Sequence, residues 1–77
     1  MTLLVKTENT EYCFTTENGK TFYSMNGIAE FLVTRQDPLI YGQRWAFYGR
    51  KLNPYTGQLG SETFFYTTKI RGVEEIN

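Results

Sequence analysis

The dipeptide Asn18-Gly19 is the feature that most constrains how this chain can fold. Both residues tolerate the positive φ angles of a type I′ turn, the two-residue turn that matches the twist of paired β-strands. The flanking residues 12–16 and 21–23 are rich in aromatic and β-branched side chains, which favour strands. Because a two-residue loop fixes the register, Glu17 should face Lys20 across the pair. The sequence therefore predicts a hairpin over residues 10–24.

The segment after this hairpin carries a helical pattern. Ile28, Phe31 and Leu32 have the spacing of one apolar face of a short helix, and serine and asparagine residues able to cap its start lie just before them. Pro38 disfavours helical geometry at the residue before it, so the helix should end by then. We predict a helix over residues 25–36.

The second half of the chain reads as strands. Residues 44–52 and 62–71 are rich in aromatic and threonine side chains, and residues 53–57 contain the proline and glycine of a turn. This predicts a second hairpin over residues 44–71, followed by a short acidic tail at 72–77. The expected fold is a single α+β domain over residues 1–77, with the order ββαββ. Its antiparallel sheet has four strands, or five if residues 3–7 form a separate strand, with the short helix packed on one face.

Two other architectures stay open at this point. The first hairpin could close over the far face of the sheet, which would give a partly closed barrel with aromatic side chains inside. A helix-turn-helix beginning at residues 24–32 would need a recognition helix over 35–43. Pro38 and Gly42 disfavour that second helix.

Cysteine content and length indicate where such a chain works. A domain of 77 residues has a thin core, which its 13 aromatic residues (six Phe, six Tyr and one Trp) must supply. Cys13 has no partner for an internal disulfide, whereas small secreted domains usually depend on several. The apolar run at residues 3–5 is too short for a signal peptide or a membrane span. We expect a cytoplasmic protein without a membrane partner.

The sequence offers little that indicates catalysis. The chain contains no histidine, so it has no Ser-His or Cys-His pair, and it lacks a zinc ligand set. Its carboxylates are scattered beside turns and on polar faces, as solvated surface charges usually are. We therefore expect no enzyme activity, no metal and no cofactor.

Charge and strand alternation together predict a binding surface. The net charge is zero, but residues 41–71 carry five basic groups and one acidic group. If the helix covers the sheet face that bears Trp45, Phe47, Phe64 and Ile70, cations and rings gather on the other face. The predicted partner-binding residues on that face are Arg44, Tyr48, Arg50, Phe65, Lys69 and Arg71, and Tyr55 at a turn tip is a separate candidate.

Two functions fit such a surface. Tyr and Arg are enriched at protein-binding hot spots, so the first is a small non-catalytic module that modulates or inhibits a larger macromolecule through protein contact. Phages and other mobile elements encode many proteins of this kind. The second is binding of single-stranded nucleic acid, in which rings stack on bases and cations follow phosphates. A homodimer that pairs two such faces is a further possibility.

Overall fold

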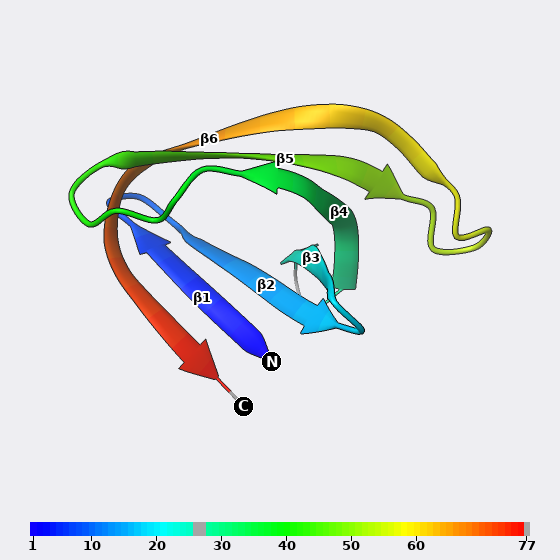
Figure 1. Ribbon diagram of the computed structural model, residues 1–77, viewed down its shortest axis with the longest axis horizontal. Helices are drawn as coiled ribbons and strands as arrows, with labels where there is room; N and C mark the ends of the chain where they lie inside the picture. Colours follow the sequence, from blue (N-terminus) through cyan, green and yellow to red (C-terminus); the bar gives the residue numbers. More distant parts are fainter. Residues whose placement is uncertain (26–27, 77) are drawn as a thin grey trace.

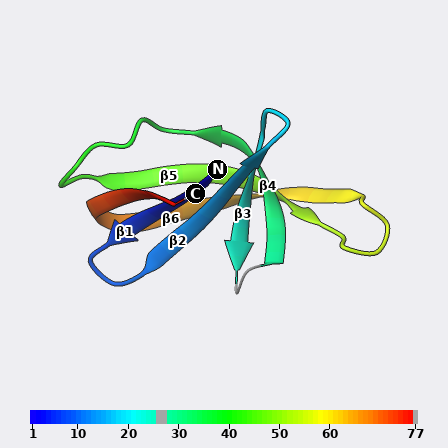
Figure 2. The ribbon, with the colours of Figure 1, turned by 90° about the horizontal axis from the view of Figure 1, so that it is seen from below.

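The computed structural model describes residues 1–25 and 28–76, which form six β-strands. Each strand pairs antiparallel with the next, and the last returns to pair with the first, so the sheet closes into a barrel (Figures 1 and 2). The strands are β1 (Thr2–Thr7), β2 (Glu11–Glu17), β3 (Lys20–Met25), β4 (Ile28–Gln36), β5 (Arg44–Leu52) and β6 (Leu59–Ile76).

The hairpin of β2 and β3 has the register that the Asn18-Gly19 turn predicts. Glu17 pairs with Lys20, and Phe14 pairs with Tyr23. Asn18 and Gly19 both have positive φ, 51° and 76°, as a type I′ turn requires. The local turn chemistry is therefore sufficient to predict this pairing.

Aromatic side chains from five strands, β2 to β6, fill the interior of the barrel. Phe47 of β5 is completely buried, and its ring lies 4.7 Å from Phe65 of β6 and 5.2 Å from Phe14 of β2, between ring centroids. Trp45 is also buried, and its indole Nε1 donates a hydrogen bond to the backbone oxygen of Asp37 at 2.7 Å. Interlocking rings of this kind add about 0.5–1.5 kcal/mol per pair beyond the area that they bury.

The predicted helix is wrong, because residues 28–36 form strand β4. Phe31 and Val33 lie two residues apart and pack against the core, whereas Leu32 between them pairs with Phe22 of β3. Aromatic and β-branched side chains suit such a strand, and pairing with β3 on one side and β5 on the other outweighs the short helical spacing. Residues 26–27, the rest of the expected helix that follows β3, lie outside the described residues.

The expected α+β class is consequently wrong as well. The described part of the chain contains no helix, and its sheet is closed rather than open with one face covered by a helix. Residues 3–7 belong to a separate strand, β1, which closes the barrel against β6. In a closed barrel each strand has one face toward the interior and one toward solvent. The sequence does not make this division clear, because aromatic residues occur on both faces.

The expected acidic tail is part of this closure. Residues 72–76 belong to β6, where Val73 pairs with Val5 and packs against the core. Glu74 forms an ion pair with Lys6 of β1 at 3.1 Å. Two consecutive glutamates favoured the prediction of a solvated tail. The segment is instead a strand with only one side toward the core, so it tolerates charged side chains. Asn77 lies outside the described residues.

A β-bulge changes which side chains of β6 face inward. Arg44 pairs with Lys69 and Ala46 pairs with Tyr66, so the ladder shifts between them. At the shift, the backbone N–H of Trp45 donates to the buried Thr67 hydroxyl at 3.2 Å. Thr67 faces inward before the shift and Ile70 faces inward after it.

Candidate binding surface

Three aromatic side chains lie together on the outer face of β5 and β6, and we name them the aromatic strip: Tyr48, Phe64 and Tyr66. The rings of Tyr48 and Phe64 are 5.0 Å apart, and those of Phe64 and Tyr66 are 6.0 Å apart with planes only 19° from parallel. Phe64 is 54% exposed and Tyr66 is 57% exposed. Exposed rings gathered in this way are characteristic of contact surfaces.

Two arginines lie over rings of the aromatic strip. The Arg35 guanidinium of β4 is 4.0 Å from the centroid of the Tyr48 ring, and that of Arg44 is 5.3 Å from the Tyr66 ring. Both distances fall within the range in which a cation is attracted to the face of an aromatic ring. The strip is therefore both aromatic and cationic.

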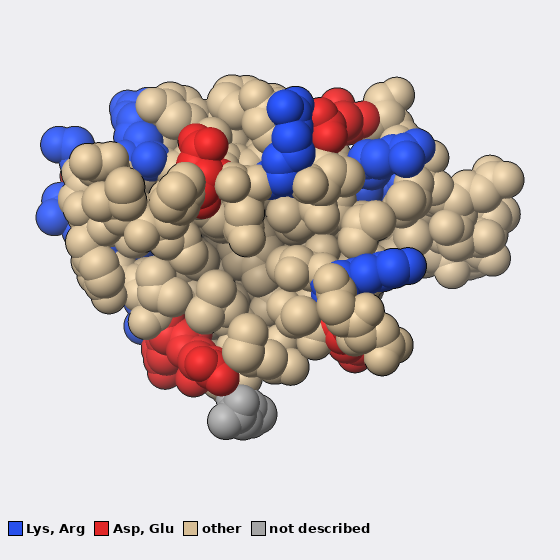
Figure 3. Space-filling model, viewed as in Figure 1, with Lys and Arg blue, Asp and Glu red and all other residues tan. Residues whose placement is uncertain are grey.

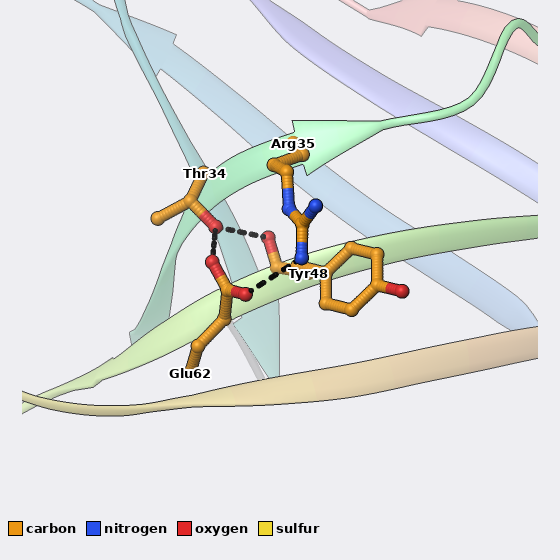
Figure 4. Close-up of polar contacts among 4 residues, drawn as sticks. All are labelled: Thr34, Arg35, Tyr48 and Glu62. Carbon is orange, nitrogen blue, oxygen red and sulfur yellow. Dashed lines mark hydrogen bonds and ion pairs between the residues drawn. The ribbon is translucent and has the colours of Figure 1, made fainter.

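A polar cluster fixes the Arg35 end of the strip (Figure 4). Arg35 Nη2 donates to Glu62 Oε1 at 3.1 Å, and the Thr34 hydroxyl lies 2.6 Å from Glu62 Oε2 and 3.3 Å from the Tyr48 backbone oxygen. The single hydroxyl hydrogen favours the closer carboxylate. Glu62 accepts hydrogen bonds from Thr34 and from Arg35. Both lower the pKa of the Glu62 carboxyl below its usual value, and the bond from Thr34 has the larger effect. Glu62 thus stays ionised and holds Arg35 against the Tyr48 ring.

Positive charge is concentrated on the side of the barrel that carries the strip. From β4 to Arg71, residues 28–71 contain six basic and three acidic side chains, a net charge of +3, and the remaining residues have a net charge of −3. In Figure 3 most of the blue side chains lie over the upper half of the molecule, where β5 and β6 run, and a red group lies near the C-terminal end. The two halves of the barrel therefore differ in charge.

Some of the predicted partner-binding residues come together here and others do not. Arg44 and Tyr48 belong to the outer face, and Lys69 and Arg71 continue along it beyond the bulge. Arg71 forms an ion pair with Glu8 at 3.0 Å, and this hydrogen bond is the largest influence that lowers the pKa of Glu8. Phe65 instead faces the interior, where it packs against Phe47.

The last two predicted residues, Arg50 and Tyr55, belong to a different feature, the projecting end of the β5–β6 hairpin. Residues 52–59, which we name the finger, project beyond the rest of the barrel (Figures 1 and 2). Arg50 supports the base of the finger: its Nε donates to the backbone oxygen of Gly60 at 2.7 Å and its Nη2 to that of Leu59 at 3.2 Å. Tyr55 lies at the tip and is 95% exposed.

The backbone of the finger is well satisfied by its own hydrogen bonds. The Asn53 side-chain oxygen accepts from the N–H of Tyr55 at 2.9 Å and from that of Thr56 at 3.3 Å. The Asn53 backbone pairs with Gln58 and Gly57 at 2.9 and 2.8 Å, and Gly57 has a positive φ of 74°. This is an Asx-type turn, which orders the tip without help from the barrel.

Beside the tip is a shallow hollow lined by residues 51–55 and 58–60. Leu52 and Leu59 face each other across the hairpin at its base, and Pro54 and Tyr55 form its outer wall. Lys51 also lines the hollow, and its ammonium lies 5.4 Å from the centroid of the Phe31 ring. The hollow is thus largely apolar in its lining, with one lysine among its residues.

Sequence reasoning missed Arg35, Glu62, Phe64 and Tyr66 as surface residues. Arg35 was expected in a helix and Glu62 at the end of a strand. No predicted element therefore placed the two side chains next to each other. The available signal for Phe64 and Tyr66 was cross-strand pairing. Phe65 pairs with Phe47, so turning Phe47 inward also turns Phe65 inward and its neighbours outward.

The described residues contain no cluster of three or more side chains that could hold a metal ion. Among them there is also no helix with the length and apolar character to cross a lipid bilayer. Comparisons with protein-family models, with curated proteins and with solved structures find no match to this chain.

Proposed function

We propose that this chain is a small, non-catalytic, cytoplasmic binding module that engages a protein partner through the finger and modulates that partner by occupying its surface. The observation that carries this proposal is Tyr55, a large ring that is 95% exposed on a backbone held by its own hydrogen bonds. A ring left in water gives the isolated domain no packing energy. Its placement on an ordered tip is that of an anchor for another molecule.

The order of the finger favours binding. Association costs conformational entropy when a loop must be fixed at the interface, and a loop that is already fixed avoids that cost. Here the Asn53 turn orders the tip and the Arg50 guanidinium ties the base to β6. Arg50 therefore acts by supporting Tyr55 and does not need to contact the partner itself.

The hollow beside Tyr55 indicates the chemistry of the partner. Leu52, Pro54 and Leu59 offer an apolar surface that an apolar side chain of the partner can fill while Tyr55 enters a pocket opposite. Lys51, which also lines the hollow, suits a carboxylate on the partner surface. We expect a protein with an apolar pocket bordered by acidic residues.

Affinity capture from the native host, followed by binding measurements on the captured protein, tests this function. Tyr55→Ser should weaken binding by about 30-fold or more, since a hot-spot side chain contributes about 2 kcal/mol or more. Tyr41→Ser is the matched control, because Tyr41 is also an exposed tyrosine (66%) but lies in the loop between β4 and β5.

The free thiol of Cys13 fits the cytoplasmic location in this proposal. Equal binding of the wild type and Tyr55→Ser to every captured protein would contradict the role of the finger. Equal weakening by Tyr55→Ser and Tyr41→Ser would contradict it too, because the finger would then have no special part.

A further inference from the structure

We infer that the outer face of β4–β6 binds a short segment of single-stranded nucleic acid, with Phe64 and Tyr66 stacking on two successive bases and Arg44 and Lys69 contacting phosphates. This site is separate from the finger. It rests on different residues, and neither proposal depends on the other.

The geometry of the two rings carries the first step. Phe64 and Tyr66 lie two residues apart on β6, both are more than half exposed, and their planes differ by 19° at a centroid distance of 6.0 Å. Near-parallel neighbouring rings can each receive one base of a strand that runs along β6. Stacking of this kind is the main sequence-tolerant contact that proteins make with unpaired bases.

The positions of the cations carry the second step. Arg44 lies over the Tyr66 ring, and exposed Lys69 is the cross-strand partner of Arg44. Two cations therefore stand directly beyond one end of the ring pair. A backbone whose bases stack on Phe64 and Tyr66 would bring its phosphates to them, and the surrounding segment, residues 28–71, has a net charge of +3.

The same surface is less suited to an acidic protein. Glu62 is the acidic residue at the other end of the strip. Its carboxylate already contacts Arg35 and Thr34, so it repels the phosphates of a nucleic-acid strand only weakly and is not available to a protein partner. Two near-parallel rings of β6 lie beside two paired cations, Arg44 of β5 and Lys69 of β6, an arrangement that suits a strand with both bases and phosphates. The finger, by contrast, presents one ring beside an apolar hollow.

Fluorescence anisotropy with labelled oligo(dT) and oligo(rU) of about ten nucleotides, at low and at moderate salt, tests this inference. The wild type should bind both, and its affinity should fall steeply as salt rises. A duplex of the same length should bind more weakly, because its bases are already stacked.

Two variants separate the contributions of rings and cations. Phe64→Leu/Tyr66→Leu keeps the apolar volume but removes both stacking faces, and it should weaken binding by about tenfold or more. Arg44→Gln/Lys69→Gln should lower the slope of log affinity against log salt by about 1.4, the value for two phosphate contacts with a single strand. Tyr55→Ser should leave oligonucleotide binding unchanged.

Circular dichroism and Trp45 fluorescence would show that each variant is folded before its affinity is compared. Absence of oligonucleotide binding at low salt would overturn the inference. Binding that the leucine variant does not weaken, or that the duplex equals, would overturn it as well. Loss of a captured protein partner in the leucine variant, without any oligonucleotide binding, would assign the aromatic strip to protein contact instead.

Discussion

At the scale of single residues, Phe47 is the side chain on which the packing of the interior most depends. It is completely buried, and its ring contacts those of Phe14, Trp45 and Phe65. We predict that Phe47→Ala lowers the free energy of unfolding by about 3–5 kcal/mol, because burial is lost and a cavity remains. A domain of this size has a total stability of about 4–12 kcal/mol, so the variant should lose a large fraction of it. Urea denaturation followed by circular dichroism measures the change.

Phe64→Ala is the matched control for this prediction. Phe64 belongs to the neighbouring strand and is the same residue type, but it is 54% exposed on the outer face. Its substitution should lower the free energy of unfolding by less than about 1 kcal/mol. Similar losses in the two variants would contradict the inward and outward assignment of these strands.

The faces of β5 could be predicted from the sequence, whereas those of β6 could not. Trp45 and Phe47 alternate with polar Arg44 and Tyr48, so the buried face of β5 is evident, and the structure confirms it. In β6, Phe64, Phe65 and Tyr66 follow one another, so both faces are aromatic and alternation alone cannot rank them. The pairing of β6 with β5 decides which face of β6 points inward, so the pattern of β5 is needed to predict it.

At the scale of elements, the bulge between β5 and β6 controls what the outer face displays. It lies between Phe65, which faces inward, and Ile70, which also faces inward although it is five positions further on. Without the shift, strict alternation would turn Ile70 outward and Lys69 inward. The cations beyond the strip therefore owe their exposure to this one irregularity, which no local pattern in the sequence announces.

We predict that Thr67→Val destabilises the protein by about 1–3 kcal/mol, although the two side chains have similar volumes. The buried Thr67 hydroxyl accepts the backbone N–H of Trp45 and donates to the Thr68 backbone oxygen at 2.7 Å, so valine would leave a buried donor unpaired. Urea denaturation measures this loss. Thr67→Ser keeps the hydroxyl and should retain most of the hydrogen-bond contribution. A more stable valine variant than serine variant would show that the hydroxyl does not hold the bulge.

The wrong prediction at the scale of elements is the helix over residues 25–36, of which the structure places 28–36 in strand β4. Ile28, Phe31 and Leu32 match a helical stripe, but the match covers little more than one turn, and Phe31 and Val33 match a strand equally well. Partners on both sides decide between the two, and β3 and β5 provide them. The hairpin at Asn18-Gly19 could be predicted because its determinants are local. The state of β4 depends on strands that are remote in the sequence.

At the scale of the whole molecule, stability depends on the pairing of β1 with β6. A chain that ends at Arg71 would lose the partners of Leu4 and Val5 and the core packing of Val73. We predict that this truncation abolishes cooperative unfolding and promotes association, because β1 becomes an open strand edge. Size-exclusion chromatography and urea denaturation would reveal both effects.

Glu74→Gln/Glu75→Gln is the control for the truncation, since it removes the two charges and keeps the strand. The Lys6–Glu74 ion pair is exposed, so its loss should cost less than about 1 kcal/mol. If the truncated chain unfolded as cooperatively as this control, residues 72–76 would be a dispensable tail after all.

Because β1 precedes the other strands of the barrel in the sequence and β6 follows them, the barrel cannot close until β6 has been synthesised. At about 5–20 residues per second, about 2–8 s pass between the synthesis of Tyr23 and that of Phe65, its ring partner on β6. Closure of the barrel therefore follows the synthesis of β6, whereas the β2–β3 hairpin, whose determinants are local, can pair earlier.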